Sequence, residues 1–426
     1  MSPASGFSTT HPTIPASGLP EPRRWAVCAL LFAALLLNYL DRQILSLLKP
    51  LLDEEFQWSN WQFGLINSVF QGAYAVSLLF WGWLMDRRAL RTLFAVAVAV
   101  WSLAAMGHTL VATVAGFVVM RLLLGLGEGG CFPGAIKATG EWFPPRERSL
   151  ATSVFNSGAN VASVLAPALI PWIALRWGWQ ASFVIPGVAG LVLAAVWLGW
   201  YRPAAPSGTG EKTAKKISWG TLLRVRQTWA FIAAKFLTDP VWWFLLIWLP
   251  DYFNRTRGLP LRESWVYLVG IYAIITALSV VGGWITGYLI GKGWSVTRAR
   301  KTGMLIFALL VLPICFVSLA GDWLAVLLIG LAGAAHQAWS ANLFTTVSDI
   351  FPDEAVASVV GIGGMAGAIG GMLFPLACGL ILDLYPSVAY AILFVGCGLA
   401  YLIAFGLNHL LAPSFGPVNL QPQKTL

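Results

Sequence analysis

Charged residues are scarce in this chain. Asp, Glu, Lys and Arg make up 11% of its 426 residues, hydrophobic residues make up 58%, and the mean hydropathy is +0.73. A soluble globular chain carries about 25% charged residues, so the composition excludes an ordinary water-soluble domain. The formal net charge of +9 does not indicate a nucleic-acid partner, because the basic residues fall mainly between apolar runs. We therefore expect an integral membrane protein surrounded by the lipid bilayer.

Cysteine and histidine are scarce as well. The chain has five cysteines, with no Cys-x-x-Cys pair, and four histidines. No metal-ligand spacing, Walker loop or Gly-x-Ser-x-Gly elbow occurs in the sequence. We therefore expect no enzyme activity, no cofactor and no metal site, and the missing Walker loop argues against ATP-driven transport.

Long apolar runs, by contrast, are abundant. About twelve of them have roughly the 20 residues that an α-helix needs to cross the hydrocarbon core. We therefore predict an all-α integral membrane fold with about twelve transmembrane helices. The runs lie near 25–48, 61–84, 92–110, 114–137, 149–172, 179–200, 228–250, 265–290, 303–319, 323–346, 356–382 and 387–411.

The basic residues are distributed unevenly between the loops. With the N-terminus placed in the cytoplasm, 18 Lys and Arg fall on the cytoplasmic side and five on the opposite side. The positive-inside rule therefore predicts that both termini are cytoplasmic. The polar stretch 203–227 is expected to be a cytoplasmic linker between two six-helix bundles, 23–202 and 228–411. Residues 1–22 and 412–426 are expected to be cytoplasmic tails, the first of them disordered.

The two predicted bundles resemble each other in sequence. A shift of 208 positions places Glu128 on His336 and Pro167 on Pro375. Two bundles related by an axis along the membrane normal are typical of carriers that alternate access to a central site. The repeat therefore favours a secondary transporter.

Among the charged residues inside predicted spans, four form two groups: Asp41 and Arg42 in the first span, and Arg121 and Glu128 in the fourth. A charge at bilayer depth costs about 2.5 kcal/mol or more, so it is rarely present without a role. A planar guanidinium binds a carboxylate through two parallel hydrogen bonds, and we assign Arg42 and Arg121 to anion recognition. Burial disfavours a charged acid while a nearby arginine favours it, so we assign Asp41 and Glu128 to proton coupling.

Two structural alternatives remain open for these four residues. Arg121 and Glu128 are seven positions apart and share one helix face, which is also compatible with a buried ion pair that only holds helices together. Asp41 and Arg42 are also compatible with a bridge in a gate on the periplasmic side.

Uncharged polar side chains also recur at helical spacing inside the spans. A polyhydroxylated ligand needs many such donors and acceptors, so we predict that they contact the substrate. Each of them is also compatible with a hydrogen bond between helices. These residues are Tyr39, Gln71, Tyr74, Asn156, Asn160, His336, Gln337, Ser340 and Asn342.

Two further groups of charged residues have structural interpretations. Lys235 and Asp239 are four positions apart and are expected to neutralise each other, and Pro240 should kink their helix. Residues that flank spans at the water interface are expected to form a gate network. They are Asp86, Arg87, Arg91, Glu141 and Arg148.

The loop after the second span resembles a known signature. Its pattern Gly82-x-x-x-Asp86-Arg87-x-x-x-Arg91 is similar to that of the major facilitator superfamily. The loop departs from that pattern at residues 89–90, where Ala and Leu replace the usual Gly and basic residue. The resemblance implies the two-bundle, twelve-helix major facilitator fold, with a gate loop that is less tightly locked.

Other motifs resemble one branch of that superfamily, the anion:cation symporters. They are the runs Asn38–Arg42 and Glu141–Pro144, together with Arg121 and Glu128. Within this branch, three further runs look like those of hexuronate transporters. They are Lys235–Pro240, Ala335–Asn342 and Gly361–Met365.

The resemblance implies roles for four residues. In related sugar-acid:proton symporters the first-span arginine and the second-span tyrosine contact the substrate, and these match Arg42 and Tyr74. The first-span acid and the fourth-span glutamate are the protonation sites, and these match Asp41 and Glu128. We therefore expect a monomeric carrier that imports a sugar-acid anion, glucuronate or galacturonate, with protons across a bacterial inner membrane. Symport or exchange of an aldonate, a dicarboxylate or another organic anion remains an alternative, as does a non-transporting membrane sensor.

Overall fold

The computed structural model describes residues 21–143, 145–202 and 218–418. These residues form α-helices and two short 3₁₀-helices, and twelve helices are long and apolar enough to cross a membrane. The prediction of an all-α fold with about twelve spans is therefore confirmed. The predicted tail residues 1–20 and 419–426 and most of the predicted linker, 203–217, lie outside the described residues.

The first half of the chain, called the N-half here, contains six of the spans. The fourth apolar run forms two helices, α5 and α6, because the regular α-helix is interrupted at Gly129 and Gly130, although both residues keep right-handed helical backbone angles. The helices are α1 (Glu21–Leu47), α2 (Lys49–Phe56), α3 (Asn60–Arg87), α4 (Leu90–Gly107), α5 (Val114–Glu128), α6 (Cys131–Trp142), α7 (Pro145–Trp177) and α8 (Trp179–Trp200), with a 3₁₀ turn at His108–Leu110.

The second half, called the C-half, contains the other six spans. Its ninth span changes from α-helix to 3₁₀-helix at Leu312, next to a proline. The helices are α9 (Trp219–Leu223), α10 (Arg226–Arg255), α11 (Leu261–Gly291), α12 (Val296–Val311) with η2 (Leu312–Leu319), α13 (Asp322–Ile350), α14 (Asp353–Leu384) and α15 (Ala389–Leu411). The short helices α2 and α9 were not anticipated, and α9 lies inside the stretch predicted as a linker.

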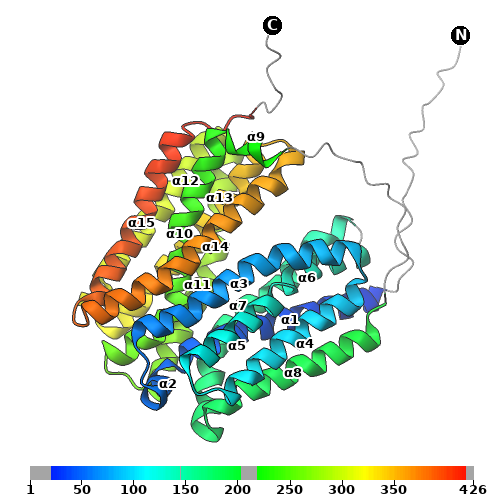
Figure 1. Cartoon of the computed structure of the whole chain (residues 1–426). Coiled ribbons are helices and arrows are strands. Elements are labelled where there is room, and N and C mark those ends of the chain that lie inside the picture. Colours follow the sequence, from blue (N-terminus) through cyan, green and yellow to red (C-terminus); the bar gives the residue numbers. More distant parts are fainter. Residues whose placement is uncertain (1–20, 144, 203–217, 419–426) are drawn as a thin grey trace, which may run out of the picture.

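The two halves meet at one end and diverge toward the other. In Figure 1 they come together beside α2, and they separate toward the end from which the two chain termini emerge. We call these the α2 end and the termini end. Near the α2 end α3 packs directly on α14, where a Cβ added at Gly64 would collide with the backbone carbonyl of Pro375. This close contact between backbones holds the α2 end shut.

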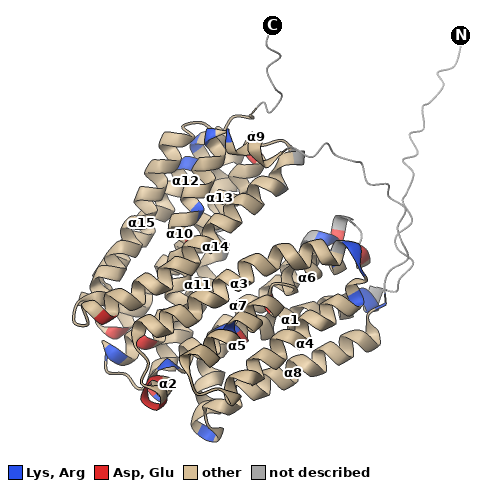
Figure 2. Cartoon of the chain, viewed as in Figure 1, with Lys and Arg blue, Asp and Glu red and all other residues tan. Residues whose placement is uncertain are grey.

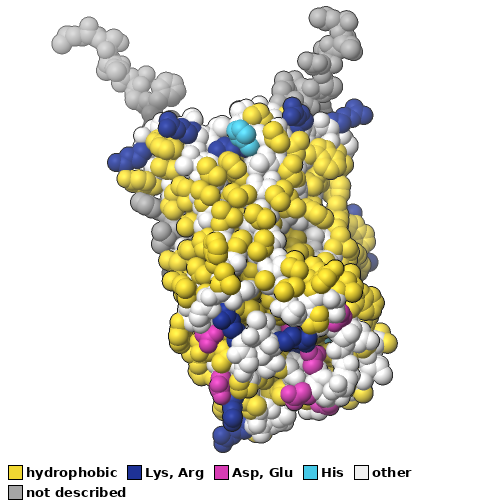
Figure 3. Space-filling view, turned by 90° about the vertical axis from the view of Figure 1, so that its left-hand side faces the viewer, with side chains coloured by type: hydrophobic (Ala, Val, Ile, Leu, Met, Phe, Trp, Pro, Cys, Tyr) yellow, Lys and Arg dark blue, Asp and Glu magenta, His cyan; other side chains and the backbone are white. Residues whose placement is uncertain are grey.

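The surface is divided as a membrane protein requires. Figure 2 shows charged residues concentrated at the two ends of the helices, with few between them. On the face in Figure 3, a hydrophobic band separates a termini end that carries Lys and Arg from an α2 end that carries both signs of charge. Apolar side chains can face lipid without losing hydrogen bonds to water. The band therefore marks the membrane-embedded region.

Candidate functional site

The α2 end is closed by a buried network that joins the two halves. The ammonium of Lys49, which is fully buried, donates to Asn60 Oδ1 at 3.2 Å and to Asp251 Oδ1 at 2.8 Å. It also contacts Asp53 on its own helix. Asp251 belongs to α10 of the C-half and accepts a second hydrogen bond from the Tyr390 hydroxyl at 2.5 Å. One lysine thereby ties α2 of the N-half to α10 of the C-half.

A second cross-half contact lies beside the first. Asp383, in the last turn of α14, accepts hydrogen bonds from the backbone N–H groups of Asn60 at 3.1 Å and Trp61 at 2.9 Å. The Asn60 side chain donates to the same carboxylate at 2.8 Å. A carboxylate at a helix N-terminus satisfies orphan donors and the helix dipole. The C-half thus caps α3 of the N-half, and we call Lys49, Asn60, Asp251 and Asp383 the α2-end lock.

The termini end is held differently, by contacts that stay within one half. Arg91 donates to the carbonyl of Leu198, Tyr201 donates to Glu141, and Arg148 donates to two carbonyls of its own half. Burial and the hydrogen bond to Glu141 raise the pKa of Tyr201, which keeps its hydroxyl a donor. The predicted gate residues Arg91, Glu141 and Arg148 therefore make their contacts within the N-half, as does Arg87, which contacts Trp83, while the side chain of Asp86 is not described. Their role as a gate stays a prediction.

A polar cavity of about 250 Å³ lies between the two halves. Six residues predicted to contact substrate line it: Tyr39, Asn156, Asn160, His336, Gln337 and Ser340. Helices α1 and α7 of the N-half and α10 and α13 of the C-half supply the walls, which is where alternating access places a shared site. The remaining lining residues, which were not predicted to contact substrate, are Ala159, Ser163, Lys235, Asp239, Trp242 and Trp243.

The N-half holds a sealed ion pair next to this cavity. Arg42 Nε lies 2.6 Å from Glu128 Oε2, and the two side chains are 6% and 0% exposed. The guanidinium lies over the rings of Tyr74, at 4.2 Å, and Tyr39, at 4.7 Å. Tyr39 also lines the polar cavity. The ring of Tyr39 therefore separates the ion pair from the cavity.

The partner of Glu128 differs from the one that sequence spacing indicated. Spacing placed Arg121 and Glu128 on one face of a helix, but the structure joins Glu128 to Arg42 on α1. Arg121 is buried, and its Nε and Nη2 atoms have no hydrogen-bond partner among the described residues. The arginine that neutralises Glu128 thus comes from another helix, 86 positions earlier in the chain.

Asp41 completes this charged cluster. It is 1% exposed, and neither carboxylate oxygen has a hydrogen-bond partner among the residues that the structure covers. Its electrostatic neighbours are Glu128 and Arg121. One oxygen of Glu128 is likewise without a partner in the described part of the chain. Buried acids with unsatisfied oxygens are costly as anions, so the cluster is suited to binding protons.

Besides Arg42 and Arg121, three other predicted substrate contacts lie outside the polar cavity. Gln71 and Arg42 line a separate space of about 20 Å³. Tyr74 stacks on the arginine instead of reaching the cavity. Asn342 donates to the carbonyl of Arg300 at 3.0 Å and so ties α13 to α12. Contact of these residues with substrate in another state stays a prediction.

The C-half contributes charge to the cavity itself. Lys235 Nζ lies 2.7 Å from Asp239 Oδ2, as the expected neutralisation requires, and both residues line the cavity. His336 is hydrogen-bonded to the Tyr401 hydroxyl at 2.5 Å and stacked on Trp242. A signal for this wall existed in the sequence, since residues 235, 239, 242 and 243 recur at the spacing of one helix face.

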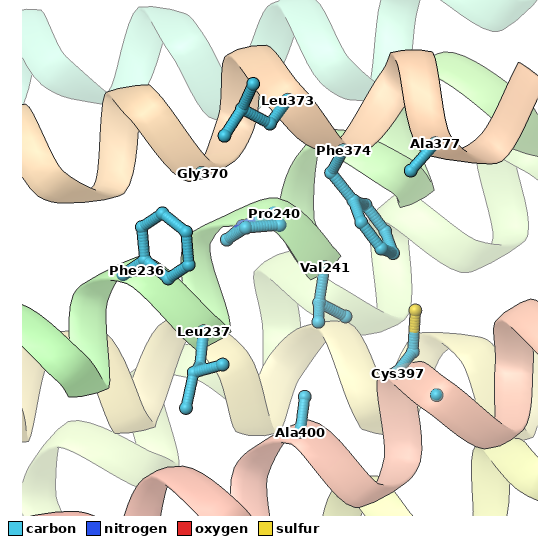
Figure 4. A pocket seen from close by; sticks show the side chains of 11 residues that line it. Phe236, Leu237, Pro240, Val241, Gly370, Leu373, Phe374, Ala377, Cys397 and Ala400 are labelled. Carbon is cyan, nitrogen blue, oxygen red and sulfur yellow. The ribbon is translucent and has the colours of Figure 1, made fainter.

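A second cavity, of about 270 Å³, is apolar and unrelated to the charged cluster. It lies between α10, α14 and α15, and Figure 4 shows Phe236, Pro240 and Phe374 facing it. The lining includes no charged residue. A sugar acid would lose its hydration there without gaining a partner, so the polar cavity is the candidate substrate site.

Comparison with known proteins identifies the class. The sequence model described as Major Facilitator Superfamily matches residues 31–375. That stretch covers most of the chain, and the twelve spans and paired halves agree with it. The chain belongs to the major facilitator superfamily and is a membrane transporter, not an enzyme. Together with its bacterial relatives, the twelve apolar helices make it a multi-pass inner-membrane protein.

Individual transporters within the superfamily are similar to this chain along most of its length. The hexuronate transporter of Escherichia coli (strain K12) is 29% identical over 384 residues, which cover 84% of this chain and 88% of that protein. The probable galactarate/D-glucarate transporter of Bacillus subtilis (strain 168) is 28% identical, with 90% and 92% covered. The resemblance to hexuronate transporters is therefore confirmed as a similarity along most of the chain.

Solved structures agree on the fold. A bacterial homolog to the human lysosomal transporter Spinster, inward-facing and unoccupied, superposes with a TM-score of 0.73 at 18% identity, covering 93% of this chain and 97% of that one. A D-xylose-proton symporter superposes with a TM-score of 0.72 at 15% identity, covering 90% and 97%. At these identities the likeness concerns the fold alone, and the predicted major facilitator architecture is confirmed.

Proposed function

We propose that this transporter carries a sugar acid, a hexuronate such as glucuronate or galacturonate, together with protons by alternating access. The observation that carries the proposal is the polar cavity between the halves, with a buried acid–arginine cluster one ring away from it. Hydroxyl-binding groups and a carboxylate-binding cation are what a sugar acid requires. The names of the relatives, which include hexuronate and galactarate/D-glucarate transporters, support the same substrate class.

Proton coupling follows from competition between Glu128 and the substrate carboxylate for Arg42. In the described state Glu128 occupies the guanidinium. A proton that binds the Glu128 carboxylate removes its negative charge and weakens this ion pair, which leaves Arg42 able to bind the carboxylate of the substrate. Asp41, whose oxygens have no partner among the described residues, is the second proton acceptor of the cluster. Proton and sugar acid therefore bind in the same state, which is symport.

The orientation of the described state follows from the distribution of basic residues. If the termini are cytoplasmic, as the 18 basic residues on that side indicate, the α2-end lock faces the periplasm. The described state is then closed to the periplasm, and the halves diverge toward the cytoplasm (Figure 1). Loading from the periplasm requires the lock to break and the termini end to close.

Uptake into proteoliposomes tests this proposal. Radiolabelled glucuronate uptake is measured with and without an inward proton gradient, with galacturonate and galactonate as competitors. We expect uptake that the gradient stimulates and that hexuronates block best. Uptake that ignores the gradient would refute the coupling roles of Asp41 and Glu128 and favour exchange. Absence of uptake for all three sugar acids would refute this substrate class and leave another organic anion as the cargo.

A further inference from the structure

The C-half carries an ion pair that the proposed mechanism does not use. Lys235 and Asp239 lie one turn apart on α10, with Nζ and Oδ2 separated by 2.7 Å. Both residues line the polar cavity, whereas Arg42 and Arg121 do not. Lys235 therefore supplies the positive charge that faces the space open to substrate.

This pair does not have the geometry of a clamp between helices. Both of its members belong to α10, so the bond joins no second helix, unlike the bond between Arg42 and Glu128. Burial of such a pair costs desolvation energy, and an apolar pair of similar size often serves stability as well or better. Lys235 is 5% exposed and its ammonium lies 4.5 Å from the centre of the Phe344 ring. A buried charge pair on a cavity wall calls for a role in binding.

The surroundings leave room for the Asp239 carboxylate to take up its position. A Cβ added at Gly367 on α14 would collide with Asp239 Oδ2, the same oxygen that binds Lys235. The three atoms nearest to that added Cβ all belong to the Asp239 side chain. The absence of a side chain at position 367 therefore permits the resting contact between Asp239 and Lys235.

We propose that Lys235 binds the carboxylate of the sugar acid in the described state, in which Glu128 still occupies Arg42, and that Asp239 is its resting partner, which the substrate displaces. An ammonium offers three donors, so the substrate carboxylate can begin to bind before Asp239 leaves. The ion pair keeps Lys235 from being an unpaired buried cation in the empty carrier. This inference rests on the proposed function, because the displaced carboxylate must be replaced by one from the substrate.

The proposal predicts opposite effects for the two members of the pair. In counterflow exchange of glucuronate, Lys235→Gln removes a charged hydrogen-bond donor and should raise KM about tenfold or more. Asp239→Asn removes the competing carboxylate and should lower KM several-fold. Gly367→Ala leaves both charges in place but pushes the Asp239 carboxylate aside, so it should also lower KM. Exchange avoids any dependence on the proton gradient.

Controls separate this result from general damage. Lys292→Gln, at an exposed position of the termini end, should leave KM unchanged. Inhibition by the uncharged amide of glucuronate should be insensitive to Lys235→Gln, because the amide carries no negative charge.

A merely structural pair would impair exchange in the Lys235, Asp239 and Gly367 variants alike, and that outcome would overturn the proposal. If Asp239→Asn fails to fold, the KM of Gly367→Ala shows whether displacing the Asp239 carboxylate favours substrate binding. If the wild type is active and Lys235→Gln leaves KM unchanged, only the assignment of Lys235 as the carboxylate-binding residue is overturned. If the wild type is inactive with glucuronate, both the proposed substrate and this assignment are overturned.

Discussion

The two halves each bury one acid–cation pair, but the pairs are built differently. In the N-half, Arg42 on α1 bonds to Glu128 on α5, and both side chains are sealed from the cavity. In the C-half, Lys235 and Asp239 share α10 and line the cavity, with the Asp239 side chain 19% exposed. The first pair connects two helices, and the second connects only two turns of one helix.

The different construction of the two ion pairs suits them to different roles in transport. Neutralising Glu128 weakens the ion pair that joins α1 to α5, so a proton there can alter how these two helices are held relative to each other. Exchanging the partner of Lys235 requires no movement of one helix against another. The N-half pair is therefore suited to coupling protons to conformational change, and the C-half pair to direct contact with an anion. Both assignments are proposals that substitution can test.

The largest expected effect comes from removing the proton site of the N-half. Glu128→Gln should abolish proton-driven accumulation but retain counterflow exchange, because an amide cannot take up and release a proton. A gradient equivalent to 100 mV is worth about 2.3 kcal/mol per proton, or about 50-fold in accumulation. The measurement is glucuronate accumulation in proteoliposomes with an imposed gradient.

Asp239→Asn is the matched variant in the C-half and should retain accumulation. Loss of both accumulation and exchange in Glu128→Gln would indicate a structural or ligand role for Glu128 in place of coupling.

The next effect, on stability in place of accumulation, is expected from the lock that joins the two halves. Lys49→Met leaves the buried Asp251 carboxylate without its ammonium partner, and breaking a buried pair in this way costs about 3–5 kcal/mol. The lower end of that range applies, because Tyr390 and Arg255 still contact Asp251. The apparent melting temperature of the purified transporter should fall.

Arg255→Gln is the control for that substitution. Its side chain is 40% exposed and lies 3.4 Å from Asp251, so its loss should cost at most about 1 kcal/mol. Equal destabilisation by the two substitutions would show that the buried ammonium does not dominate the lock.

The smallest expected effect comes from packing beside the N-half pair. A Cβ at Gly125 would lie 2.6 Å from the carbonyl oxygen of Phe70, so Gly125→Ala must push α5 away from α3. Overpacking of this kind costs about 1–3 kcal/mol, and displacement of α5 should also weaken proton-driven uptake. Thermal stability and uptake are measured together.

Gly406→Ala on α15 is the matched control, since nothing lies within 4 Å of its added Cβ. It should be neutral or slightly stabilising, by up to about 1 kcal/mol. If the alanine at 125 were equally harmless, close packing of α5 on α3 would not be what positions Glu128.

Several features of the site could be predicted because they depend on one helix at a time. Charges inside apolar runs are visible in the sequence, and Asp41, Arg42, Arg121 and Glu128 all prove to be buried. His336, Gln337 and Ser340 share the cavity-facing side of α13. Asn342, on the same helix, could have been excluded by helix geometry, because at about 100° per residue it points nearly opposite to that side.

Contacts between helices could not be predicted in the same way. Spacing offered only Arg121 as a partner for Glu128, whereas the position of α1 relative to α5 brings Arg42 to it. The choice of Lys235 as the cation facing the cavity depends on how α10 sits against the N-half. A periodic pattern can show which residues share one face of a helix, but not which other helix that face meets.

The sequence by itself determined the membrane class, the twelve spans and the charges buried within them. These follow from local composition, since each span must hold about 20 apolar residues whatever its neighbours are. Only the tertiary structure decided which acid pairs with which cation, which charge reaches the cavity and which end is closed. Those outcomes depend on side chains from helices far apart in the chain meeting within hydrogen-bond distance, and packing between helices sets that distance.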